Sequence, residues 1–148
     1  MSYVPWVVLV FIALAWVGSA FYYSRKVKEV ADPREKLPSV LPAGITLFRI
    51  AETANIARRY RVLLDGRDVG AIAVGESLHI PTPSPHTEMQ VQVDWCKSRP
   101  LRVNLVDGAS ELVECGCAYQ DITCLLAIFF RPHQYLYLER SALNVGKA

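Results

Sequence analysis

The amino-terminal stretch "VPWVVLVFIALAWVGSAFYY" most constrains this chain, because residues 1 to 24 contain no Asp, Glu, Lys or Arg. A helix of about 20 apolar residues crosses the hydrocarbon of a bilayer, and this stretch has that length. A signal peptide is the alternative, but such peptides begin with basic residues and none is found here. The sequence therefore predicts a transmembrane anchor at 1–24, with aromatic anchor residues Trp6, Phe11, Trp16, Tyr22 and Tyr23.

Basic residues follow the apolar stretch directly. Arg25, Lys26 and Lys28 begin a charged and then proline-rich linker, residues 25–44. Because basic flanks stay on the cytoplasmic side, we expect the amino terminus outside the cell and the remainder in the cytoplasm. The prediction is a single-pass protein of the inner (cytoplasmic) membrane. The three bases are expected at the membrane surface, against the lipid bilayer.

The charge balance beyond the linker argues against nucleic acid as a partner. The chain has 16 Lys and Arg and 14 Asp and Glu, and residues 25–36 hold five of the bases and three of the acids. The other 11 bases and 11 acids cancel. Nucleic-acid affinity comes mainly from neutralised phosphates, so a balanced domain has no surplus charge to supply it.

Residues 45–140 consist of short apolar runs separated by turn residues, followed by a tail at 141–148. In 87–95 apolar residues alternate with polar ones, which places Met89, Val91, Val93 and Trp95 on one strand face, with Trp95 as a core anchor. Asp65-Gly66 and Asp107-Gly108 predict two hairpins, 60–65 with 69–74 and 101–106 with 110–115. The fold class is mainly β: one transmembrane helix and then a small antiparallel β-sandwich or barrel.

One segment does not follow this pattern. Residues 122–130, "ITCLLAIFF", are uncharged, mostly apolar and too short to span a bilayer. They form either a buried strand or core helix, or an apolar patch that contacts another subunit or the membrane surface. In the second interpretation the partner contacts are Ile122, Leu125, Leu126, Phe129 and Phe130.

About a third of the chain carries a family resemblance. The stretches are "YRVLLDGRDVGAIAVGE", "VQVDWCKSRPLRVNLVDG" and "LVECG", which give the pattern Y-x-V-x-x-D-G…D-W-C-x-S…E-C-G. The chain resembles small bacterial membrane-anchored proteins with a PEGA-like compact β-sandwich module. A usual form has "P-G-x-H" before the second stretch, where this chain has "PSPH" with Pro85. The resemblance implies a fold and no catalytic residues.

The four cysteines, Cys96, Cys115, Cys117 and Cys124, allow three interpretations. They match the number of ligands of a tetrahedral zinc site, but zinc sites use two C-x₂₋₄-C pairs and this chain has one C-x-C. A redox role and simple packing as small apolar side chains are the others. In a reducing cytoplasm a structural disulfide is not expected, and packing is favoured.

Little in the sequence indicates an enzyme. The histidines, His79, His86 and His133, lie in or beside turns and strands, and no catalytic signature surrounds the cysteines. No phosphate-binding glycine loop is present, and we expect no cofactor and no small-molecule substrate.

The favoured function is a non-catalytic accessory or scaffolding subunit that contacts other membrane protein subunits. The expected layout is also that of the H subunit of photosynthetic reaction centres, so the complex could be energy-transducing, photosynthetic or respiratory. The alternatives are a membrane-tethered metal or redox sensor and a ligand-binding β-module.

Overall fold

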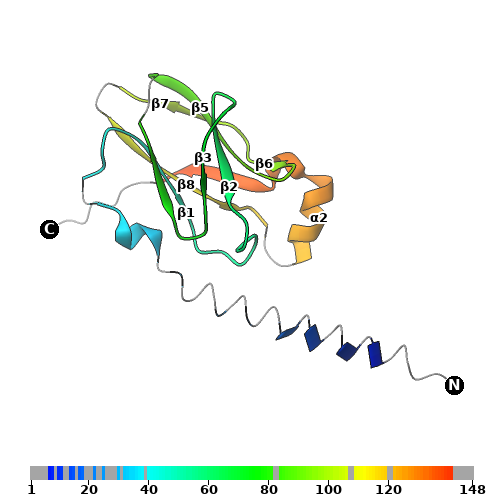
Figure 1. Cartoon of the computed structure of the whole chain (residues 1–148). Coiled ribbons are helices and arrows are strands. Elements are labelled where there is room, and N and C mark those ends of the chain that lie inside the picture. Colours follow the sequence, from blue (N-terminus) through cyan, green and yellow to red (C-terminus); the bar gives the residue numbers. More distant parts are fainter. Residues whose placement is uncertain are drawn as a thin grey trace.

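The computed structural model describes residues 7–8, 10–11, 14–15, 17–18, 22, 25, 30, 32–38, 40–81, 84–106, 109–119 and 122–141. In the described residues from 44 onward, nine strands form two β-sheets that lie face to face (Figure 1). The prediction of a mainly β fold is confirmed in this part of the chain.

The first sheet has the strand order β4-β1-β8-β9. Its strands are β4 (Ser77–Ile80), β1 (Gly44–Arg49), β8 (Ser110–Cys117) and β9 (Leu136–Arg140). β1 is antiparallel to β4 but parallel to β8, and β8 is antiparallel to β9. The parallel pair corrects the prediction of a purely antiparallel sandwich.

The second sheet has the order β3-β2-β5-β6, with β7 also paired to β5. Its strands are β3 (Arg67–Ile72), β2 (Tyr60–Leu64), β5 (His86–Val93), β6 (Cys96–Lys97) and β7 (Leu101–Asn104). β6 pairs with the carboxyl-terminal end of β5 and β7 with its amino-terminal end. All these pairs are antiparallel.

The hydrophobic core lies between the two sheets. Met89, Val91 and Val93 of β5 are buried, as their alternation predicts. They meet Ile45 and Leu47 of β1 in one continuous cluster. Burial of apolar surface on this scale is the main stabilising contribution to such a fold.

The two hairpin predictions have different outcomes. β2 and β3 form the hairpin at Asp65-Gly66, and both turn residues have the positive φ that a type I′ turn needs. The second hairpin is wrong, because β7 pairs with β5 and β8 pairs with β1 and β9. The chain crosses between the sheets after β7, and β8, buried along most of its length, takes an interior position.

The transmembrane prediction is not borne out. In the described part of the chain, no helix combines the length and the apolar character that crossing a membrane requires. Isolated positions between 7 and 25 have helical backbone, but they do not make a described helix of about 20 residues. This finding corrects the predictions of an anchor at 1–24 and of a single-pass protein. It likewise corrects the predicted inner-membrane localisation and orientation.

The residues assigned to that anchor divide into two groups. Phe11, Tyr22 and Arg25 lie at described helical positions with exposed side chains. The others lie outside the described residues: Trp6, Trp16, Tyr23, Lys26 and Lys28.

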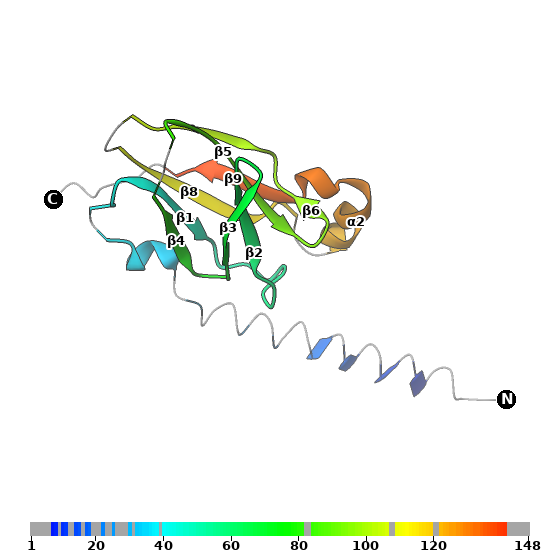
Figure 2. The ribbon, with the colours of Figure 1, turned by 45° about the horizontal axis from the view of Figure 1, so that its top comes forward.

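The linker before β1 folds back on the first sheet. Pro33–Lys36 forms a short 3-10 helix, η1, which lies against this sheet in Figures 1 and 2. Leu41 packs with Phe48 and Leu112 in a second, smaller apolar cluster. These contacts cover the side of β1 and β8 that faces away from the main core.

Candidate functional site

The apolar segment identified in the sequence forms a helix, α2 (Ile122–Phe130), at one end of the sandwich beside β6 (Figures 1 and 2). Pro132 lies two residues beyond its end, as is usual after a helix. Ala127 is buried, and Cys124 and Ile128 pack in part against the core. One side of α2 therefore attaches it to the domain.

The other side of α2 carries large apolar side chains in solvent. Leu126 is 58 % exposed, Phe129 76 % and Phe130 79 %. Their spacing of i, i+3 and i+4 makes them neighbours on one helix face. The same segment thus contains both core and surface residues, whereas the two sequence interpretations treated it as one or the other.

Trp95 joins this face from another element. It lies in the two-residue turn between β5 and β6, is 62 % exposed, and its Nε1 donates to the Ile128 carbonyl of α2 at 3.4 Å. The prediction of a core anchor is wrong because Asp94 has a positive φ of 50°. The strand alternation ends there, and the indole turns outward.

We call Trp95, Leu126, Phe129 and Phe130 the α2 surface. Exposed contiguous apolar patches on soluble domains mark interaction sites more often than isolated residues do. All five partner-contact residues predicted from the sequence belong to α2, and Leu126, Phe129 and Phe130 are exposed on it. Ile122 and Leu125 belong to the helix, but their side chains lie outside the described part.

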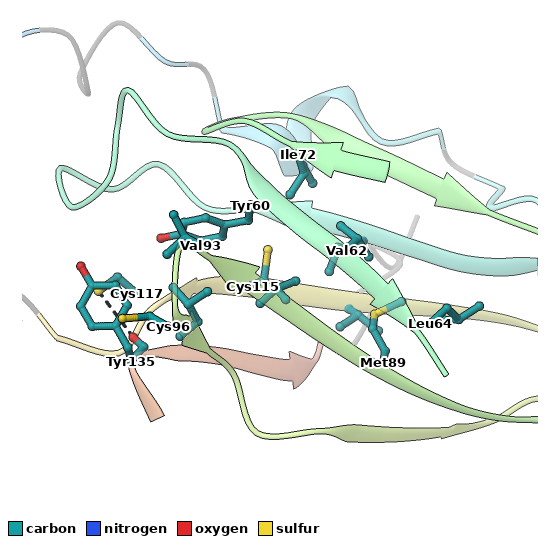
Figure 3. Packing of buried hydrophobic residues seen from close by; sticks show 14 of the residues in the cluster. Tyr60, Val62, Leu64, Ile72, Met89, Val93, Cys96, Cys115, Cys117 and Tyr135 are labelled. Carbon is teal, nitrogen blue, oxygen red and sulfur yellow. Dashed lines mark hydrogen bonds between the residues drawn. The ribbon is translucent and has the colours of Figure 1, made fainter. Parts of the chain in front are cut away.

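The cysteines are part of the core. Cys96, Cys115 and Cys117 are buried, Cys124 is half-buried, and all four are free. Figure 3 shows Cys96 and Cys117 beside Tyr135, with a hydrogen bond from the Cys117 thiol to the Tyr135 carbonyl at 3.6 Å. Their surroundings are those of small apolar side chains.

Burial keeps the thiols of Cys96, Cys115 and Cys117 protonated. It raises the pKa of Cys117 to about 12 and also raises the pKa values of Cys96 and Cys115. The thiolate is the form that attacks electrophiles and binds metals, so these groups are poor nucleophiles near neutral pH. Among the described residues, no group of three or more His, Cys, Asp and Glu side chains is arranged to hold a metal ion.

Two of the three histidines have polar neighbours. His79 Nδ1 is 3.4 Å from the Thr46 hydroxyl, and His86 Nδ1 is 3.0 Å from the Asn104 side-chain oxygen. His133 is exposed in η2 (Pro132–Gln134). In the part of the chain described, these contacts do not pair a histidine with a cysteine, as a Cys–His nucleophile would require.

A chain of polar side chains fixes the base of α2. The Cys124 thiol lies 2.7 Å from the Tyr135 hydroxyl, and Asn55 Nδ2 donates to that hydroxyl at 3.0 Å and to the Tyr60 hydroxyl at 3.2 Å. Burial, as the largest cause, raises the pKa values of both tyrosines, so they remain neutral hydrogen-bonding groups. The helix is thereby connected to the loop between β1 and β2.

That loop is organised by a buried ion pair. Arg49 is fully buried, and its Nη2 and Nε donate to Glu52 Oε1 at 2.7 and 3.0 Å. Its guanidinium also lies 3.5 Å from the centre of the Tyr60 ring. Glu52 accepts a third and a fourth hydrogen bond, from the Tyr60 hydroxyl and from the Cys117 amide. The pair joins β1, β2 and β8.

Sequence reasoning missed this pair, although a signal was present. Arg49 follows Ile45 and Leu47 at the strand period of two, so it lies on the face that these two residues direct into the core. A buried arginine needs a carboxylate partner, and Glu52 lies three residues further along. The pair connects three strands, and the hydrogen bonds of Asn55 and Tyr135 link it to α2.

Comparison of the chain with models of known protein families, with curated proteins and with solved structures found no match.

Proposed function

We propose that this protein is a non-catalytic accessory module that docks onto another subunit of a larger protein complex through the α2 surface. The observation that carries the proposal is the exposure of Leu126, Phe129 and Phe130 on a helix attached to the core, together with the exposed Trp95, whose indole donates to a carbonyl of that helix. The membrane anchor is not part of the proposal. A photosynthetic or respiratory complex stays a prediction for the identity of the partner.

The energetic gain from covering this surface is large. Full burial of one Phe or Leu side chain contributes about 1.5–3 kcal/mol. Aromatic residues are also the side chains that most often dominate a protein interface. Covering the four side chains would therefore supply several kcal/mol toward association, before the cost of lost motion is subtracted.

The attachment of α2 reduces that cost. Ala127 is buried in the core, Cys124 contacts the Tyr135 hydroxyl and Trp95 donates to the Ile128 carbonyl. Because the helix is held at these points, little conformational freedom remains to be lost when a partner binds. The buried cysteines support the non-catalytic part of the proposal, because protonated thiols act as packing groups.

The experiment compares three tagged full-length chains expressed in the native host. Phe129→Asp/Phe130→Asp places charges in the α2 surface. The control, Val106→Asp, changes a side chain that is 80 % exposed. Val106 follows β7, which pairs with the amino-terminal end of β5, whereas β6 pairs with the carboxyl-terminal end of β5. We expect one defined set of co-purifying chains with wild type and V106D, lost in the double variant. Equal recovery from all three, with unchanged melting temperatures, would refute docking through α2.

A further inference from the structure

The edge of the α2 surface carries mostly basic residues. Arg131 follows Phe130 directly and is exposed, and His133 is exposed in η2. Lys97 is half-exposed in β6, which lies against η2 and begins one residue after Trp95. The apolar surface therefore has basic neighbours on the α2 side and on the β6 side.

The described acid at this edge is already paired. Asp94, next to Trp95, forms an ion pair with Arg58, and both side chains are exposed. This pair adds no net charge. Lys97 and Arg131 thus leave an excess of positive charge beside the apolar side chains.

From this juxtaposition we infer that the α2 surface binds an amphipathic helix of another protein, whose apolar face is flanked by Asp or Glu residues. The inference rests on the proposed function and names the kind of partner. Leu126, Phe129 and Phe130, at the i, i+3 and i+4 spacing, form a ridge that can pack into a groove between the side chains of a second helix. Trp95 contributes a fourth contact, one that sequence reasoning had placed in the core.

Charge distinguishes this partner from a second copy of the same chain. Two copies meeting through their α2 surfaces would each bring Lys97 and Arg131 to the interface, where like charges repel. A helix with acidic flanks gains attraction at the same positions. Charges at the edge of an interface act chiefly on specificity and association rate, so the effect is greatest at low salt.

The test uses two synthetic helical peptides with the same leucine- and phenylalanine-rich face, one flanked by glutamates and the other by lysines. Each is titrated into the full-length protein by calorimetry at low and high salt. We expect the glutamate peptide to bind more tightly, by on the order of ten-fold at low salt, with the ratio falling as salt screens the charges. F129D/F130D should bind neither peptide, and Trp95→Ala should weaken both equally.

Charge-reversed variants separate local charge from total charge. Lys97→Glu/Arg131→Glu should remove or invert the preference between the peptides. Arg67→Glu/Arg102→Glu makes the same change in net charge at exposed positions of β3 and β7 and should keep the preference.

Three results would overturn the inference. The first is equal or tighter binding of the lysine peptide, or no binding of either. The second is a dimer of the wild-type chain in sedimentation that F129D/F130D disrupts, which assigns the surface to a second copy. The third is binding to phosphatidylserine vesicles in place of the glutamate peptide. None of these results is read from co-purifying chains, so the co-purification experiment tests the proposed function separately.

Discussion

Replacing Glu52 by glutamine removes the charge that balances a fully buried arginine. Arg49 would keep its hydrogen bonds to the carbonyls of Arg58 and Asn55, at 2.6 and 3.1 Å, so its guanidinium would stay in the interior without a counter-charge. The new amide would also point either its oxygen or its N–H₂ group at the Cys117 N–H. If the N–H₂ group faces the Cys117 N–H, two donors meet there. If the oxygen faces the Cys117 N–H, the N–H₂ group faces the Arg49 guanidinium, which is also a donor.

The expected cost of this change is about 3–5 kcal/mol, the range for breaking a buried pair by removing one partner. With a urea m-value of about 1.5 kcal/mol per M, the unfolding midpoint should fall by about 2–3 M. Urea unfolding followed by circular dichroism measures this shift. Glu88→Gln, an equivalent change at an exposed side chain, is the control and should stay within about 0.5 kcal/mol of wild type.

A double-mutant cycle checks the reason for that cost. Arg49→Met in the Glu52→Gln background removes the unbalanced charge, so the double variant should be more stable than the sum of the two single losses predicts. A loss below about 1 kcal/mol for Glu52→Gln alone would refute the reasoning, because a fully buried arginine could not then depend on this carboxylate.

Three further predictions follow from the packing and the pKa values. Gly116→Ala would place a Cβ 2.8 Å from the Tyr137 ring, so a loss of about 1–3 kcal/mol is expected and a melting curve would show it; an unchanged melting temperature would contradict this contact. Burial raises the pKa of Cys115, so the folded thiol stays protonated while the unfolded thiol ionises near pH 8.5. Stability due to this group is complete below that pH and declines above it, by about 1 kcal/mol from pH 8.5 to 9.5. Cys115→Ala should reduce this decline in urea unfolding, and an identical pH dependence would disprove the assignment. Leu41→Ala should cost about 2–4 kcal/mol, while Arg34→Ala, which breaks a largely exposed ion pair, should cost less than about 1 kcal/mol; the reverse order would show that the linker is not held by its apolar contacts.

The sequence predicted most of the strands because short apolar runs between turn residues are typical of strands, and one of these runs also alternates with a period of two. β5 follows this rule from Thr87 to Val93. The Asp65-Gly66 turn was predictable since few residues tolerate its positive φ values. The pairing of β7 and β8 was not, because an Asp-Gly pair indicates a turn and does not say which strands meet on either side of it.

The candidate site was predictable only in part. The segment 122–130 is conspicuous, but its apolar residues lie on both sides of a helix, so hydrophobicity alone could not separate Ala127, in the core, from Phe129, in solvent. Trp95 was misplaced because one positive φ at Asp94 reverses the direction of the side chain. The covering of β1 by the linker depends on contacts between Leu41 and residues distant in sequence, which no local pattern records.

The most direct test of the central claim is photocrosslinking in living cells from a benzoylphenylalanine placed at position 129. Phe129 is 76 % exposed, so the bulky replacement has room and reports whatever covers α2. We predict a crosslink to another protein from position 129 and none to that protein from position 106. No crosslink from position 129, or the same products from both positions, would contradict docking through α2.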